Sequence, residues 1–233
     1  MISDLRSVKK GIIEVLFPNV CVSCNLKLSL NEKFVCKVCL YDRFEHANPE
    51  QEQCSGDILL PEGVLIQHAL WVFDKGGQLQ ELFHHLKYSR LVGIGEDMGE
   101  ALGNSLLENE HFKELNEPVL IPVPLHQKKK RVRGYNQAYH ISKGMKIVTG
   151  LSIISEDGVT RVKNTRTQTG FSLEKRRNNI AEAFFVNKED CIKDRDCIIV
   201  DDVFTTGATA FELASTLKKS GSGKIGIATV AQA

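Results

Sequence analysis

Residues 197–209 read CIIVDDVFTTGAT and are the part of the chain that says most about its architecture. The stretch starts with four apolar residues, which predict a buried strand, and this strand runs into two adjacent acids, Asp201 and Asp202. A helical pattern, AFELASTLKK, follows at 210–219. In a parallel sheet covered by helices, ligands bind beyond the carboxyl ends of the strands. We therefore expect the two acids to meet a ligand.

The loop after the acids has the composition of a phosphate site. Hydroxyls and backbone amides that lead into the first turn of a helix can bind a phosphate dianion; here they come from Thr205, Thr206, Gly207, Ala208 and Thr209. No lysine follows the glycine, so a monophosphate ester fits better than a nucleoside triphosphate. Two neighbouring carboxylates can accept hydrogen bonds from the two hydroxyls of a vicinal diol. The stretch predicts a ribose 5-phosphate site, and the alternative is an acidic strand end before a capped helix.

Strands alternate with helices through residues 56–233, which predicts an α/β domain with a mostly parallel twisted sheet flanked by helices. The expected strands cover 68–74, 118–125, 197–203 and 224–231, and the expected helices cover 77–88, 94–109, 134–149 and 206–219. Cys197 opens an apolar strand and is interpreted as a small core residue.

The first 55 residues differ in character and are expected to form a separate module. Residues 2–16 predict an imperfect amphipathic helix that Pro18 stops. Residues 45–57 are polar and have the composition of a linker. The opening stretch has only short apolar runs, so neither a signal peptide nor membrane insertion is expected, and we expect the protein in the cytoplasm.

Two Cys-x-x-Cys pairs, separated by eleven residues, lie within this module. They are Cys21 with Cys24 and Cys36 with Cys39. Four thiolates at this spacing can close the tetrahedral shell of a structural Zn²⁺ without an open position for chemistry. Two unrelated pairs of buried thiols, or redox use of one pair, are the alternatives.

Positive charge is concentrated in residues 126–177, although the whole chain has a net charge of only +1. This segment holds thirteen Lys or Arg and three acids, so its charge is +10 (13 minus 3) and that of the remainder is −9 (1 minus 10). Such a segment points to a polyanion, either the phosphates of a small molecule or those of nucleic acid. A solvated lysine-rich loop is the alternative.

Two loops carry this charge. The first, HQKKKRVRGYNQ at 126–137, follows the strand end PVPL, and Arg131 and Arg133 before Gly134 are better phosphate candidates than the lysines because a guanidinium binds phosphate bidentately. The second, at 161–179, contains Arg161, Gln168 and Arg176 and is long and polar enough to be a mobile cover. A surface loop with a short helix is the alternative for the second.

The stretch DDVFTTGAT resembles the signature of type I phosphoribosyltransferases. The whole order, two Cys-x-x-Cys pairs, PVPL, RGYNQ, the 161–179 stretch and DDVFTTGAT, resembles the ComF family over nearly the full chain. The family usually has Leu where this chain has Phe171, and Arg is common where a lysine run precedes Arg131. The resemblance implies an N-terminal zinc ribbon joined to a type I phosphoribosyltransferase fold.

The resemblance also implies a site for phosphoribosyl pyrophosphate with Mg²⁺. It makes Asp201 and Asp202 the catalytic acids, adds Val203 to the ligand-binding run 201–209, makes 126–137 the pyrophosphate loop and makes 161–179 a loop that closes over the ligand. Two functions follow as expectations: a magnesium-dependent phosphoribosyltransferase or binding protein, and an adaptor that handles single-stranded DNA beside a helicase-like partner in DNA uptake. A silent regulator that senses the ligand is a third. The +10 segment has only three aromatic residues, which argues against a base-stacking surface. The acceptor substrate is not identifiable from the residues, and the residues leave open whether the protein catalyses a reaction or only binds the ligand.

Overall fold

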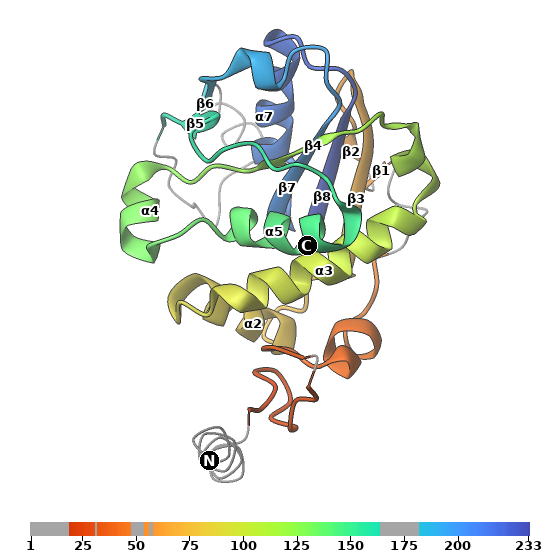
Figure 1. Ribbon diagram of the computed structural model, residues 1–233, viewed down its shortest axis with the longest axis vertical. Coiled ribbons are helices and arrows are strands. Elements are labelled where there is room, and N and C mark those ends of the chain that lie inside the picture. Colours follow the sequence, from red (N-terminus) through yellow and green to blue (C-terminus); the bar gives the residue numbers. More distant parts are fainter. Residues whose placement is uncertain (1–18, 31, 48–53, 56–57, 164–181) are drawn as a thin grey trace, which may run out of the picture.

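The computed structural model describes residues 19–30, 32–47, 54–55, 58–163 and 182–233, and a parallel four-stranded sheet forms its centre (Figure 1). The strands are β3 (Val64–Val72), β8 (Ile225–Gln232), β7 (Cys197–Phe204) and β4 (Val119–Pro122), in that order across the sheet. Each neighbouring pair is parallel. The predicted α/β class is confirmed, and the predicted strands are found with shifts of a few residues at their ends.

Helices cover both faces of the sheet because alternate residues of each buried strand point to opposite sides. Ile198 and Val200 of β7 pack with α3 (Val92–Glu108) and α5 (Gln137–Thr149). Cys197 and Ile199 pack on the other face with α7 (Ala208–Lys219) and with the antiparallel pair β5 (Val159–Arg161) and β6 (Phe184–Val186). Cys197 is completely buried, as its position in an apolar strand predicts.

Glycines let α3 and α5 touch through their backbones. A Cβ atom at Gly99 would lie 2.0 Å from the carbonyl oxygen of Ile141, and one at Gly144 would lie 2.0 Å from that of Glu96. No side chain fits at either position without moving a helix. The contact fixes the distance between the two helices on this face.

One expected loop is a helix. Residues 126–133 were expected to form an open basic loop, but Gln127–Arg133 form α4, and the predicted helix 134–149 begins only at Gln137. The His126 side chain accepts a hydrogen bond from the Lys128 amide at one end of α4. Gly134 ends the helix with a φ of 85°, a conformation that favours glycine. The loop prediction is wrong. The helix has no apolar stripe that would reveal it in the sequence, and it forms because the two caps satisfy its ends.

The other described elements are short or connect the sheet to the cysteine module. They are α2 (Gln78–Tyr88), the π-helix Cys39–Arg43, β1 (Cys54–Ser55), β2 (Ile58–Leu59) and the 3-10 helices Glu110–Glu114 and Glu189–Cys191. The predicted helix at 2–16, most of the predicted linker, Gln168 and Arg176 lie outside the described residues. In the part of the chain that the structure describes, no helix combines the length and apolar character needed to cross a membrane.

The cysteine module packs against the helical layer that holds α2 and α3 (Figure 1). Asp97 of α3, only 6% exposed, accepts hydrogen bonds from the amides of Phe34 and Val35, both at 2.9 Å. The Phe34 ring lies on Gly93, where a Cβ atom would come within 1.9 Å of it. The module and the helices therefore share buried surface, and a division of the chain near residue 55 stays a prediction.

The start of the predicted linker pairs with the free edge of β3. His46 forms an antiparallel bridge with Trp71, and the Val72 amide donates to the carbonyl oxygen of Glu45 at 2.8 Å. Phe44 packs edge-on against Trp71, with ring centroids 5.0 Å apart. These contacts connect the module to the sheet itself.

Candidate functional site

The two adjacent acids lie where β4 and β7 part. The pairing of these strands ends at Pro122 with Val200, whereas β7 continues along β8 to Phe204. Asp201 and Asp202 therefore stand on a strand edge that β4 no longer covers, and both are half-buried. Each carboxylate accepts one hydrogen bond from the next backbone amide, Asp201 from Asp202 and Asp202 from Val203, both at 2.9 Å. The acids are held in place with oxygens left for other donors.

Asp202 forms an ion pair with Lys87 of α2. The Lys87 Nζ lies 2.6 Å from Oδ2 of Asp202, and the two side chains are 24% and 18% exposed. Burial acts to raise the pKa of Asp202, but the charge and the hydrogen bond of Lys87 outweigh it, so the pKa lies below its ordinary value. Asp202 therefore stays ionised at neutral pH.

Asp201 has the opposite character. Burial, together with the negative charge of Asp202, raises the pKa of Asp201 to about 7, although Lys87 and Arg161 act to lower it. Neighbouring carboxylates whose environments separate their pKa values are typical of functional sites. The pair can hold a proton near neutrality until a ligand brings further positive charge or hydrogen-bond donors.

Helix α4 places two cations at these acids. Lys129 and Arg133, one helical turn apart, are the partly buried basic residues of α4, and Arg133 is close enough to lower the pKa of Asp202. The pKa of Lys129 lies below its ordinary value because the side chain is partly buried and because Arg161 and Arg133 are near. Lys87, Lys129, Arg133 and Arg161 thus gather beside Asp201 and Asp202. The site carries more positive than negative charge.

The loop after the acids has the expected course into a helix. Gly207 precedes α7 with a φ of 70°, and a Cβ atom there would lie 2.5 Å from the Phe211 ring. The Phe211 amide donates back to the Gly207 carbonyl oxygen, which closes the first turn. The first amides of a helix have no partner within it, so those of α7 point toward the loop of Thr205 and Thr206. The predicted residues 201–209 lie together at the carboxyl end of β7.

Arg131, a predicted phosphate residue, faces elsewhere. It is exposed and lines a cavity of about 680 Å³ between α4 and the β5 strand, where Lys130 pairs with Glu156 at 2.7 Å. Arg161 borders both this cavity and the acids, because it lines the one and its charge acts on Asp201. The structure thus brings Arg133 and Arg161 to the acids and leaves Arg131 at the cavity between α4 and β5, while their roles toward a ligand stay predictions.

Two residues of the site were not among the predicted ones, Lys87 and Lys129. Lys129 was placed in the basic loop but ranked below the arginines, and the spacing of Lys129 and Arg133 on one helical face becomes informative only once α4 is known. Lys87 pairs with an acid 115 positions later in the chain (202 minus 87), and no local pattern signals such a contact.

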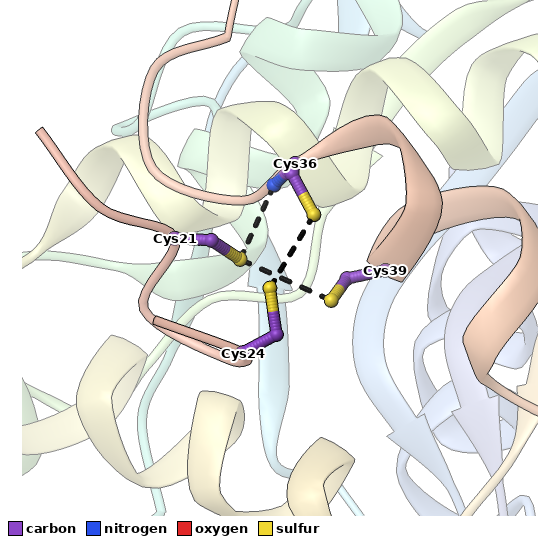
Figure 2. Close-up of side chains that lie close together, drawn as sticks. All are labelled: Cys21, Cys24, Cys36 and Cys39. Atoms are coloured by element: carbon purple, nitrogen blue, oxygen red, sulfur yellow. Dashed lines mark hydrogen bonds between the residues drawn. The ribbon is translucent and has the colours of Figure 1, made fainter. Parts of the chain in front are cut away.

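The four paired cysteines meet at the predicted metal site (Figure 2). Their sulfurs all lie within 4.8 Å of one another, with Cys21 to Cys39 at 3.9 Å and Cys24 to Cys36 at 3.7 Å. Four sulfurs bound to one zinc at about 2.3 Å lie about 3.8 Å apart at the corners of a tetrahedron. Disulfide sulfurs would be at about 2 Å, and these cysteines are free thiols. The set fits a tetrahedral metal ion such as zinc.

The surroundings of the thiols suit a negatively charged metal cluster. The Cys36 amide donates to the sulfur of Cys21 at 3.3 Å, and the Arg43 guanidinium lies 3.9 Å from the sulfur of Cys39. Such donors stabilise thiolates and fix the orientation of the ligands. Four thiolates would fill a tetrahedral shell and leave no position for a substrate.

The chain is similar to several known proteins. A model of the phosphoribosyl transferase domain matches residues 100–233. The DNA utilization protein YhgH of Escherichia coli O157:H7 is 30% identical over 221 residues, which cover 89% of this chain and 94% of that protein. Competence protein F of Haemophilus influenzae is 32% identical over 158 residues, 66% of this chain and 68% of that protein. Competence protein ComFC of Bacillus subtilis is 21% identical over 205 residues, which cover 87% of this chain and 79% of that protein.

Proposed function

Because this chain belongs to the ComF family and carries a phosphoribosyl transferase domain, we propose that it binds phosphoribosyl pyrophosphate with Mg²⁺ and transfers the phosphoribosyl group. The observation that carries the proposal is the acid pair at the end of β7, which stands between a helix N-terminus and four cations. A sugar diol, a 5-phosphate and a pyrophosphate are the three groups that such an arrangement would recognise.

In this proposal each part of the ligand has its own partner. Asp201 and Asp202 accept hydrogen bonds from the ribose hydroxyls. The amides and hydroxyls of 205–209 bind the 5-phosphate at the N-terminus of α7. Lys129 and Arg133 lie on the side of the acids where α4 passes, and they would meet the pyrophosphate.

Catalysis would then rest on charge and position. As the bond from the sugar carbon to pyrophosphate lengthens, negative charge grows on the leaving group and positive charge on the sugar. The cations of α4 stabilise the first, and ionised carboxylates at the sugar stabilise the second. Mg²⁺ would arrive with the ligand beside Asp201 and Asp202, and its charge would help the pyrophosphate to leave. The carboxylate oxygens of Asp201 and Asp202 are hard donors, which suit Mg²⁺.

The test is binding of the magnesium complex of phosphoribosyl pyrophosphate to the purified protein by calorimetry. The double variant Asp201→Ala with Asp202→Ala is expected to abolish binding, because both hydroxyl acceptors are lost. Unchanged affinity in this variant would refute the site. Pyrophosphate release against a panel of bases, nucleotides and single-stranded DNA would then show whether turnover occurs and with which acceptor.

We infer that the four-cysteine site holds one Zn²⁺, which would order a module too small to bury a large core by itself. Thiolates keep this role only where they stay reduced, so the proposal places the protein in the cytoplasm.

A second function is favoured by the names of the relatives, a DNA utilization protein and competence proteins. Lys128 and Arg131 of α4 are exposed and would contact the phosphates of single-stranded DNA during uptake. An electrophoretic shift with single-stranded DNA over a salt series tests this adaptor role, because phosphate-driven binding must weaken steeply with salt. Affinity that does not change with salt would contradict it.

A further inference from the structure

The Lys87–Asp202 ion pair is the starting point. Lys87 lies near the end of α2, whereas Asp202 stands on β7. The bond is short, 2.6 Å, and only 24% of the lysine side chain is exposed. A partly buried lysine that holds an acid of the proposed sugar site is placed to respond when a sugar arrives.

The end of α2 that carries Lys87 is fixed from both sides. The Tyr135 hydroxyl donates to the carbonyl oxygen of Leu86, one of the last carbonyls of the helix, which lack partners within it. The Arg133 guanidinium lies 5.9 Å from the centroid of the Tyr88 ring, next to Lys87 on the other side. These contacts tie α2 to the end of α4 and to the residues that follow it. The backbone of Lys87 is therefore held at the rim of the site.

The Lys87 ammonium also lies over an aromatic ring. Its Nζ is 5.3 Å from the centroid of the Phe83 ring, one helical turn earlier in α2, which is a cation–π contact. The flexible four-carbon stem of a lysine allows its ammonium to turn from one anion to another. The ammonium carries three donors, and one of them engages Asp202.

The charges of the site leave Lys87 a second anion to bind. In the proposed complex the ribose hydroxyls donate to Asp202 and so compete with Lys87 for the same carboxylate. The pyrophosphate brings several negative charges into a site where burial, together with the charges of Arg161 and Arg133, lowers the pKa of Lys129. If Lys87 left Asp202, it would be a third cation, after Lys129 and Arg133, to neutralise the charge of the pyrophosphate.

We propose that Lys87 is a ligand-binding residue that exchanges Asp202 for the pyrophosphate when the sugar occupies the acid pair. Tyr135 is the positioning residue that keeps the end of α2 at the site. This inference rests on the proposed function and assigns part of the pyrophosphate subsite to α2, outside the two basic loops. Sugar and pyrophosphate would then help each other to bind, because the sugar releases the lysine that the pyrophosphate uses.

The experiment separates the two halves of the ligand. Calorimetry would measure inorganic pyrophosphate with Mg²⁺, ribose 5-phosphate, and the magnesium complex of phosphoribosyl pyrophosphate on the full-length, metal-loaded protein. The test variant is Lys87→Met, which keeps an unbranched side chain and removes the charge. Lys87→Arg restores a charge at the same place. The matched control is Lys113→Met, which breaks a pair of the same length, Lys113 to Glu110 at 2.6 Å, on an exposed 3-10 helix.

With ribose 5-phosphate present, so that the sugar has released the lysine, Lys87→Met is expected to weaken pyrophosphate binding by about 10- to 100-fold, the range for losing a hydrogen bond between charged groups. Its affinity for ribose 5-phosphate should be equal to that of the wild type or higher, because the competitor for Asp202 is gone. Lys87→Arg should recover most of the pyrophosphate affinity, and Lys113→Met should change neither.

Three results would overturn the inference. Equal pyrophosphate affinity in Lys87→Met and Lys113→Met would remove Lys87 from the subsite. An equal loss of both ligands in Lys87→Met would make the lysine a mere support for Asp202. In either case the proposed function would stand if the wild type binds the whole ligand. A wild-type protein that binds none of the three ligands would end the proposed function and this inference together.

Discussion

Replacing Asp97 by alanine tests how the cysteine module is joined to the helical layer. This carboxylate belongs to α3 and accepts both amides of the Phe34–Val35 segment, which leads directly into Cys36. Burial raises the pKa of Asp97, and the two amides and the charge of Lys33 act in the opposite direction. With alanine, two amides in a nearly closed environment would lose their acceptor.

The size of the effect follows from the two hydrogen bonds. A bond to a charged acceptor contributes about 1.5–3 kcal/mol, so losing both should cost about 3 kcal/mol at the low end. For a protein of this length, each kcal/mol lowers the melting midpoint by about 2–4 °C, which gives a drop of about 6–12 °C. The loss should also speed release of the metal, because the segment that carries Cys36 is no longer held.

Thermal unfolding and transfer of zinc to a chromogenic chelator measure both effects. The matched control is Glu100→Ala, one turn further along α3, which breaks the exposed pair of Glu100 with Lys33 at 2.8 Å and should cost no more than about 1 kcal/mol. If Asp97→Ala melts within the error of Glu100→Ala and releases zinc at the same rate, the two amides do not join the module to α3 and the reasoning is refuted.

Two further predictions concern pH and the metal. Asp201→Asn should raise the melting midpoint of the ligand-free protein more at pH 8 than at pH 5, because a folded-state pKa of about 7 keeps Asp201 protonated at the lower pH and ionised at the higher one. In the unfolded chain the carboxyl has a pKa of about 3.9 and is ionised at both pH values. The folded protein therefore loses the proton on Asp201, and the stability that this proton gives, as the pH rises through 7. Melting curves of both proteins at the two pH values check this, and an equal gain would contradict the environment described for Asp201. For the metal, elemental analysis should find one zinc per chain in the wild type and less in Cys24→Ser, and a chelator should lower the melting midpoint; a chain that melts identically without metal would argue against a structural role.

The sequence was most informative where local patterns coincide with tertiary structure. The apolar runs of β7 and β8 predict buried parallel strands, and the acids that follow β7 do stand at its exposed carboxyl end. The spacing of the cysteines predicts a common site, and their sulfurs meet within 4.8 Å. In both cases the residues that make the feature are close in sequence or repeat with a fixed spacing.

Features that depend on distant contacts were missed. Lys87 looks like an ordinary charge at the end of an amphipathic helix until β7 brings Asp202 to it. Asp97 looks like a polar position of α3 until the cysteine module covers it. The helix at 127–133 was taken for a loop because its residues have no apolar periodicity, and only the caps at His126 and Gly134 mark its ends. These contacts depend on the tertiary structure, so a short window of sequence does not predict them.

The place of β8 in the sheet has a consequence for how the protein is made. This strand lies between β3 and β7, yet a ribosome begins it only about 150 residues after β3, counted from Val72 to Ile225. Until then the nascent chain has an apolar β3 with no sheet partner on that side and a separate β4–β7 pair. We expect newly made chains to depend on protection by chaperones during this interval, and messages cut short before codon 225 to yield aggregates instead of a partly active protein.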